Sequence, residues 1–241
     1  MYLVDIQLDD PLENLVCDEL LLNHCDEGEG TPLIRFWEST ETCVVLGYGN
    51  RMESEVYVDQ CRAEAVPVYR RCTGGGTVLL GPGSLSYSLV LPLSFHSSLN
   101  SVCGVNEFIM ERQRATLERL LKGPVRICGC TDLVQGSLKF SGNAQRRRRS
   151  ALLFHGTFLL DYDLSAMDRL LRSPSRQPAY REQRGHSAFT KNIGLDPQSL
   201  REGLCDTWEV SRTWEGVFRW NDVAEESRVR RGNEKWLCLS R

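Results

Sequence analysis

Arg71-Cys-Thr-Gly-Gly-Gly76 is the most informative stretch of this 241-residue chain. Three consecutive glycines allow a sharp backbone turn and let N–H groups approach a ligand with no Cβ atoms in the way. The arginine that opens the stretch offers a planar fork of N–H donors, which suits a carboxylate or a phosphate. The stretch therefore predicts a loop that holds an anion.

Two segments further along the chain have a similar character. Lys139-Phe-Ser-Gly-Asn-Ala-Gln145 places a lysine among small and amide-bearing residues, and His155-Gly-Thr157 follows it. Only four of the 29 basic residues are lysines, so Lys139 is expected to be needed for its compact ammonium charge. The alternative is that such a polar segment is an ordinary surface turn.

The order and spacing of these segments resemble those of the lipoate–protein ligases, within the wider biotin/lipoate ligase and octanoyltransferase superfamily. In that family the first loop reads roughly Arg-Arg-x-Ser/Thr-Gly-Gly-Gly-x-Val. The second motif is Asp-Leu, a short turn and Lys-Ile/Phe-Ser-Gly-Asn/Ser-Ala-Gln, and the third is His-Gly-Thr-Leu-Leu. This chain matches them at 70–78, at 132–133 with 139–145, and at 155–160. The resemblance covers most of the chain, from about residue 9 to about residue 192.

The resemblance implies an α+β fold, a mixed β-sheet with packed helices, related to the catalytic domains of biotin ligases and class II aminoacyl-tRNA synthetases. The sequence agrees, because its strand clusters are bracketed by helical segments. A helix is expected over 53–65, and a hairpin over Gly81-Pro-Gly83 is expected to join strands 77–80 and 84–91. Residues 1–241 are expected to form a single catalytic domain, with C-terminal helices from about residue 164 and without the accessory domain of typical bacterial ligases.

The resemblance also implies the chemistry. Members of the family activate lipoate or octanoate with ATP to an acyl-adenylate, then transfer the acyl group to a lysine of a lipoyl carrier domain or of a glycine-cleavage H-like protein. Lys139 is the expected catalytic residue, since one donor placed at developing negative charge can contribute roughly 3 kcal/mol. Asp132 is the expected Mg²⁺ ligand, because a hard cation bound to phosphates prefers a carboxylate.

The other expected site residues have simpler roles. Arg71 would neutralise phosphate, the glycine loop would donate N–H groups to substrate oxygens, and Trp37 would line an apolar slot for the acyl chain. Leu80 stands where many ligases have a histidine, so one polar contact is expected to be missing. The full expected set for substrate and ATP binding is Trp37, Asn50, Arg71, Thr73, Gly74, Gly75, Gly76, Ser141, Gly142, Asn143, Gln145, His155, Gly156 and Thr157.

Two other functions stay open. An octanoyl or lipoyl transferase of the same fold would use a cysteine thiolate and no ATP, and Cys72, Cys128 and Cys130 are candidate nucleophiles. A non-catalytic acyl-binding or nucleic-acid-binding relative is supported only by the arginine run 146–149. That run can equally be a solvated strand end, or a docking patch for an acidic carrier or a triphosphate.

Composition limits the remaining possibilities. A hydrophobic fraction of 41% and a charged fraction of 25% are ordinary for globular proteins. The net charge of −3 gives no general attraction to nucleic acid. No apolar run approaches the ~20 residues of a membrane span, and the N-terminus lacks a secretory signal. The ten cysteines match no zinc or disulfide framework, so we expect a cytoplasmic enzyme with free thiols and consider a separate accessory subunit as a partner.

Overall fold

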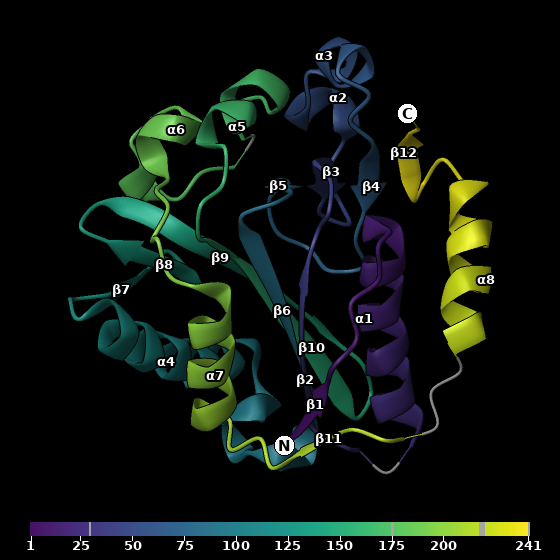
Figure 1. Ribbon diagram of the computed structural model, residues 1–241, viewed down its shortest axis with the longest axis vertical. Coiled ribbons are helices and arrows are strands. Elements are labelled where there is room, and N and C mark those ends of the chain that lie inside the picture. The colour runs from purple at the N-terminus through teal and green to yellow at the C-terminus, as the bar shows by residue number, and fades with distance from the viewer. Residues whose placement is uncertain (29, 175, 217–219, 241) are drawn as a thin grey trace.

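The computed structural model describes residues 1–28, 30–174, 176–216 and 220–240 (Figure 1). A large sheet runs through the centre of the molecule. Its strands are β1 (Tyr2–Val4), β2 (Leu33–Glu38), β6 (Ser84–Pro92), β7 (Arg126–Cys128), β8 (Asp132–Gln135), β9 (Leu138–Arg147), β10 (Ala151–Leu159) and β11 (Arg212–Thr213). Their spatial order is β11-β1-β2-β6-β10-β9-β8-β7. β1 pairs in parallel with β2 and β11, while the other pairs are antiparallel, so the sheet is mixed.

A second, smaller sheet lies beside the first and carries the segments on either side of the glycine loop. Its strands are β3 (Cys43–Leu46), β4 (Val68–Arg70), β5 (Val78–Leu80) and β12 (Leu237–Leu239), in the order β12-β4-β3-β5. The glycine loop connects β4 to β5, which are separated by β3 in this sheet.

Helices cover both faces of the large sheet (Figure 1). The α-helices are α1 (Pro11–Glu27), α2 (Met52–Glu55), α3 (Val58–Ala63), α4 (Val102–Leu121), α5 (Leu164–Leu170), α6 (His186–Phe189), α7 (Pro197–Thr207) and α8 (Trp220–Arg231). Three short 3-10 turns are η1 (Leu93–Phe95), η2 (Ser97–Asn100) and η3 (Ala179–Arg181). Of the helices described, none combines the length and the apolar character that a membrane span requires.

The side-chain alternation of the strands explains this layering. In β2, Ile34 and Phe36 pack into the core with α4 and α7, while Leu33 and Trp37 pack on the opposite face with α1. Successive strand residues point to opposite faces, so one buried strand serves both layers. The α+β fold with helices packed on a mixed sheet is therefore confirmed.

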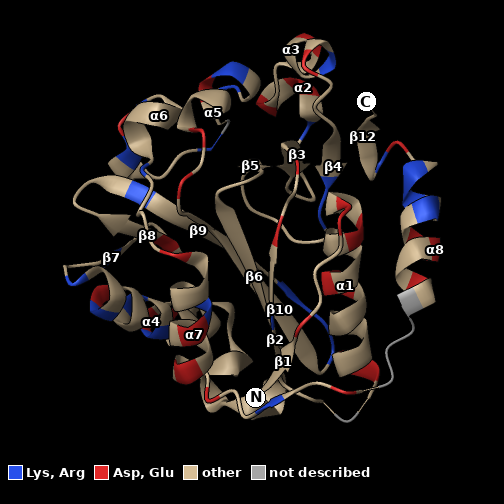
Figure 2. Ribbon diagram, in the orientation of Figure 1, with Lys and Arg blue, Asp and Glu red and all other residues tan. Residues whose placement is uncertain are grey.

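The helix ends follow the sequence. Asp10 caps α1 by accepting a hydrogen bond from the Leu12 N–H, and Pro11 occupies the first helical position. α8 lies beside α1, and its C-terminal turn is rich in basic residues (Figure 2). Arg230 of α8 pairs with Glu19 of α1 at 2.9 Å, and both side chains are nearly buried.

Two expectations about local structure are wrong. β5 and β6 do not form a hairpin, because β5 pairs with β3 and β6 pairs with β2 and β10. The turn between them is held elsewhere: the Gly83 carbonyl accepts hydrogen bonds from the Leu160 and Asp161 N–H groups. The helix expected over 53–65 is split into α2 and α3, because Val56 takes an extended conformation and bridges to Leu171.

Candidate functional site

Arg71 holds the glycine loop in its conformation through hydrogen bonds to the loop itself. The residue is only 7% exposed, and burial lowers the pKa of its guanidinium to about 10. Nε donates to Thr73 Oγ1 at 2.8 Å, and Nη2 donates to the carbonyls of Gly74 and Gly76 at 2.6 and 2.8 Å. Most of the guanidinium is thus used to fold the loop, which the sequence did not predict. A direct contact between Arg71 and a phosphate stays a prediction.

The loop also requires glycine for steric reasons. Gly75 has φ +87°, in the region that favours glycine. A Cβ on Gly47 would lie 2.2 Å from the Gly75 carbonyl oxygen, so the loop packs directly on the turn after β3. Asn50, at the end of that turn, donates to Thr77 Oγ1 at 3.0 Å. Asn50 therefore holds the far side of the loop.

Arg70 ties the same turn to the C-terminal strand. Its Nη1 donates to the carbonyls of Gly47, Tyr48 and Asn50 at 3.0, 3.1 and 2.6 Å. Its Nε donates to the Lys235 carbonyl at 2.8 Å. The consecutive arginines of the motif thus have separate structural tasks, one inside the loop and one behind it.

Lys139 and Asp132 form an ion pair beside the loop. Lys139 Nζ lies 2.7 Å from Asp132 Oδ1, and the Tyr180 hydroxyl donates to Asp132 Oδ2 at 2.7 Å. The pairing of β8 with β9 shifts register between Leu133 and Val134, beside Lys139. Such irregularities recur near active sites, where they re-aim side chains. Lys139 remains 28% exposed, so a ligand can reach it.

Two adjoining cavities meet at this ion pair. The first has a volume of about 160 Å³ and the second of about 270 Å³. Lys139 and Asp132 line both of them. Both are also lined by Gly76, Thr77, Val78, Gly142 and Thr157. Lys139 can therefore act on two ligands, or on two parts of one reacting complex.

The first cavity is lined by both apolar and polar side chains. Leu15, Trp37, Val45 and Leu80 supply apolar surface, so Leu80 takes part in the wall where the family often has a histidine. Its polar lining includes Asp18, Asn143 and His155. Of the expected site residues, those that line the first cavity are Trp37, Arg71, Gly76, Asp132, Lys139, Gly142, Asn143, His155, Gly156 and Thr157.

The other expected residues do not line the first cavity. Ser141 lines the second cavity only. Gln145 donates to the Val102 carbonyl and to Asn106, both in α4, and so anchors that helix to β9. The expected residues that appear in the lining of neither cavity are Asn50, Thr73, Gly74, Gly75 and Gln145.

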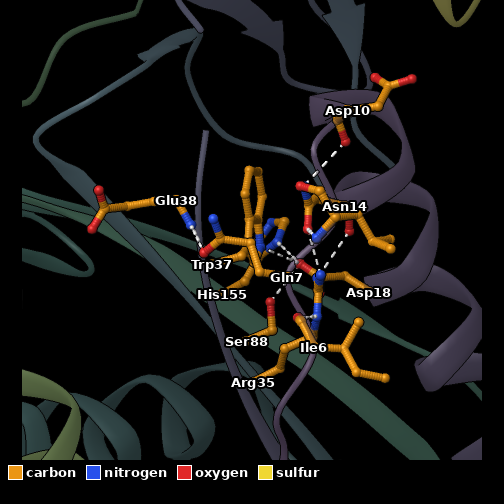
Figure 3. A network of polar contacts seen from close by, with 11 residues as sticks. Ile6, Gln7, Asp10, Asn14, Asp18, Arg35, Trp37, Glu38, Ser88 and His155 are labelled. Carbon is orange, nitrogen blue, oxygen red and sulfur yellow. Dashed lines mark hydrogen bonds and ion pairs between the residues drawn. The ribbon is translucent and has the colours of Figure 1, made fainter. Parts of the chain in front are cut away.

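His155 is connected to the glycine loop through Thr73. It also lies beside the buried Asp18 carboxylate (Figure 3). Thr73 Oγ1 lies 2.7 Å from His155 Nε2 and already accepts from Arg71, so its own proton is free for the histidine. This arrangement favours the neutral ring with its proton on Nδ1, which lies 3.9 Å from Asp18 Oδ2. Burial lowers the pKa of His155, against the opposing effect of Asp18, which agrees with a neutral ring.

Asp18 is the centre of a buried polar network that sequence reasoning missed. Arg35 Nη1 lies 2.8 Å from its Oδ1, and its Oδ2 accepts from Ser88 Oγ at 2.5 Å and from Trp37 Nε1 at 3.3 Å. Burial alone would raise the pKa of Asp18, but the Arg35 guanidinium, with help from His155 and Ser88, holds it below its usual value. An arginine inside the otherwise apolar run Leu33–Trp37 was the available signal.

Asn143 explains the glycine of the third motif. Its Oδ1 accepts from the Tyr87 hydroxyl at 2.6 Å, and its Nδ2 donates to the Thr131 carbonyl at 2.6 Å. A Cβ on Gly156 would lie 1.7 Å from that same Oδ1. Gly156 is therefore required so that Asn143 can lie against β10.

The candidate cysteine nucleophiles differ in access. Cys72 is buried, and burial raises its pKa to about 12, which keeps it a thiol at neutral pH. Cys128 is half-buried. Cys130 is exposed and lines the second cavity with Lys139. Only Cys130 among the three combines exposure with a place at a cavity.

The first two arginines of the run, Arg146 and Arg147, end β9, and the other two follow it. Arg146 donates to the Cys72 carbonyl, Arg147 to the Leu99 carbonyl, and Arg148 to Asn23 Oδ1. Three of the four arginines thus bind neighbouring protein groups. This supports the interpretation of the run as a strand end.

Comparison with known proteins identifies the family. The family model described as the lipoyl protein ligase A/B catalytic domain matches residues 10–194. A protein of Aeropyrum pernix assigned as a lipoate-protein ligase A is 31% identical over 206 residues, which cover 85% of this chain and 73% of that protein. The octanoyltransferase LipM of Clostridioides difficile is 25% identical over 208 residues, covering 78% and 75% of the two chains.

Solved structures agree on the fold. A bi-partite lipoate protein ligase of Thermoplasma acidophilum superposes with a TM-score of 0.82 at 20% identity, covering 98% of this chain and 95% of the other. A lipoate-protein ligase A bound with ATP gives a TM-score of 0.77 at 21% identity, covering 98% and 97%. Together with the extent of the family match, these findings show that the chain belongs to the lipoyl protein ligase A/B catalytic-domain family.

Proposed function

We propose that the protein is an ATP-dependent lipoate–protein ligase that activates lipoate or octanoate and transfers it to a lysine of a lipoyl carrier domain or an H-like protein. The supporting observation is the pair of cavities that meet at Lys139. The apolar walls of the first suit an acyl chain, and the second offers the room next to it that a nucleotide needs. One structural relative is a lipoate-protein ligase A bound with ATP, which supports a role for ATP here.

Both chemical steps would develop negative charge at the junction of the cavities. In the first, a carboxylate oxygen of the acid bonds to the α-phosphorus of ATP and the bond to pyrophosphate breaks. In the second, the amine of the target lysine bonds to the acyl carbon, AMP leaves and the amine loses a proton. The Lys139 ammonium, held by Asp132, would stabilise the charge of both transition states.

The proposed Mg²⁺ site at Asp132 is less well supported by the residues present. Both carboxylate oxygens already accept from a donor, Oδ1 from Lys139 and Oδ2 from Tyr180. Within the described part of the chain, no group of three or more His, Cys, Asp or Glu side chains could hold a metal ion. A Mg²⁺ ion that enters with ATP would be held mainly by phosphate oxygens and water, as is usual for this ion.

A cysteine-dependent transferase is the second candidate. Its support is the exposed Cys130 at the second cavity, together with relatives named octanoyltransferase LipM. Its thiolate would attack an acyl thioester and release the carrier thiol, and the target lysine would then displace the Cys130 thiolate. No nucleotide takes part in this route.

Incubation with lipoate, ATP and Mg²⁺, followed by mass spectrometry for lipoyl-AMP, tests the ligase. We expect lipoyl-AMP from the wild type and from Cys130→Ser, and none when ATP is omitted. Acyl transfer from an acyl carrier without ATP, accompanied by an acyl thioester on Cys130 and lost in Cys130→Ser, would establish the transferase instead.

We further propose that a separate accessory subunit completes the transfer. The support is the bi-partite organisation of the Thermoplasma acidophilum ligase, one chain of which matches nearly all of this chain. A closing subunit would exclude water from the adenylate, which water otherwise hydrolyses. Single-turnover lipoylation of a purified lipoyl domain by this chain alone should be slow, and full-rate transfer without added protein would contradict the proposal.

A cytoplasmic location belongs to the same proposal. All ten cysteines are free thiols. Free thiols persist in a reducing compartment, so their number supports the cytoplasm.

A further inference from the structure

Arg181, at the end of η3, is a buried cation that the motifs did not indicate. Its side chain is only 5% exposed. Nε donates to the Arg184 carbonyl at 3.0 Å, and the guanidinium carbon lies 4.7 Å from the centre of the Phe189 ring. These contacts fix the plane of the guanidinium without neutralising its charge.

Within the part of the chain that the structure describes, no carboxylate forms an ion pair with Arg181. Among the described residues, Arg181 has no ion pair, and its Nη2 is buried without any hydrogen-bond acceptor. Asp132 and Asp168 act on its charge from a distance, but each already accepts from other donors. A buried guanidinium without an anion is costly, and burial lowers the pKa of Arg181 accordingly. The arrangement is therefore incomplete without an anion.

The second cavity lies where such an anion would bind. Arg181 lines it together with Lys139 and the exposed Arg176. Asp132, which also lines it, has its charge offset by Lys139 at 2.7 Å. The lining thus carries an excess of positive charge, and the planar fork of Arg181 suits the oxygens of a phosphate.

We propose that Arg181 binds a phosphate group of the substrate in the second cavity. The inference rests on the proposed function, in which the phosphate belongs to the polyphosphate of ATP. The phosphate ester on the arm of an acyl carrier has the same chemistry and is the source in the transferase alternative. The proposal concerns the buried arginine, and the source of the phosphate is decided by the probes below.

Isothermal titration with pyrophosphate, ATP and 4′-phosphopantetheine, on the wild type and three variants, tests the assignment. Arg181→Met should weaken phosphate binding by at least about tenfold, because a charge-assisted, bidentate contact is lost. Arg181→Lys keeps the positive charge but not the planar fork of donors, so its phosphate affinity should lie between those of the wild type and Arg181→Met. Arg62→Met, which removes an exposed cation that lines neither cavity, should change affinity by less than about threefold.

Thermal unfolding gives a second test, because the expected change in stability on removing Arg181 is zero or positive. Without added phosphate, Arg181→Met should be at least as stable as the wild type, because an uncompensated buried charge has been replaced by an apolar side chain of similar size. Pyrophosphate should raise the melting temperature of the wild type and leave that of Arg181→Met unchanged.

The outcomes separate this inference from the ligase assignment. Unchanged phosphate affinity in a folded Arg181→Met or Arg181→Lys variant, or an equal loss in Arg62→Met, overturns the role of Arg181. Failure of every phosphate probe to bind the wild type overturns it too, even if lipoyl-AMP forms. Arg181-dependent binding of 4′-phosphopantetheine without lipoyl-AMP formation supports the site and rejects the ligase.

Discussion

Arg35→Met should be among the most destabilising single substitutions in this protein. Arg35 and Asp18 are 1% and 2% exposed and pair at 2.8 Å. Removing only the arginine leaves a carboxylate buried with hydrogen bonds but without its counter-charge. Breaking such a pair from one side costs about 3–5 kcal/mol. For a chain of this size each kcal/mol lowers the melting temperature by about 2–4 °C, so the melting temperature should fall by roughly 6–20 °C.

Urea denaturation followed by fluorescence and circular dichroism measures the loss, provided that the two transitions coincide. The matched control is Arg114→Met, a partly exposed arginine that pairs with Glu111 and Glu118 at 2.8 and 2.6 Å. It should cost less than about 1 kcal/mol, because exposed pairs are weak. The double variant Arg35→Met/Asp18→Asn removes both buried charges and should recover more than about 1 kcal/mol relative to Arg35→Met.

The effect of pH on the stability lost in Arg35→Met can be predicted from the pKa of Asp18. The folded pKa of Asp18 is lowered, so its contribution to stability is present above its ordinary value of about 3.9 and is lost as the pH falls through the folded value. In Arg35→Met, burial raises the pKa of the Asp18 carboxyl, because the opposing effect of Arg35 is gone. The carboxyl is then neutral at acid pH, so the free-energy cost of a buried, unpaired carboxylate disappears there. The stability gap between wild type and Arg35→Met should therefore narrow from pH 7 to pH 4. A loss below about 1 kcal/mol at pH 7, or a double variant less stable than Arg35→Met, would refute the reasoning.

Three further predictions concern the site. Lys139→Ala should lower lipoyl-AMP formation at least about 100-fold with little change in melting temperature. The control is Lys191→Ala, which should stay near the wild-type yield because Lys191 Nζ binds Gln135 and neither residue lines a cavity. Comparable yields from the two variants would count against Lys139. Gly156→Ala should destabilise the fold by about 1–3 kcal/mol, measured by urea denaturation, because its methyl group collides with Asn143. His155→Gln should reduce the loss of stability that the wild type shows as the pH falls below about 6.5, since the buried neutral ring resists protonation.

The fold could be predicted from the sequence wherever a segment was long or carried a motif. The strands expected over 77–80 and 84–91 correspond to β5 and β6. The strands β1, β11 and β12, of two or three residues each, are too short to produce a pattern and exist only through their pairing. The supposed hairpin over Gly83 failed because pairing with distant strands outweighed a plausible local turn.

Ten of the expected site residues line the first cavity with Lys139 among them, so the motifs predicted residues that the fold brings together. The motifs also suggested that Arg71 faces a ligand, whereas it mainly binds loop carbonyls. Hydrogen bonds to backbone atoms leave no trace in a residue pattern. Asp18 and Arg35 lie 17 residues apart on different elements, so only the packing of α1 on β2 reveals their ion pair.

The connection between Arg70 and the C-terminal strand has a consequence for how the chain reaches its native state. The Arg70–Lys235 hydrogen bond joins residues 165 positions apart, and Arg230 binds Glu19 across 211 positions. Contacts over such separations require closure of very long loops and slow folding. Until β12 pairs with β4, the small sheet presents an unpaired edge, which can associate with the same edge of another chain. Refolding at high protein concentration should therefore lose material to aggregation during this interval, before the turn behind the glycine loop is held in place.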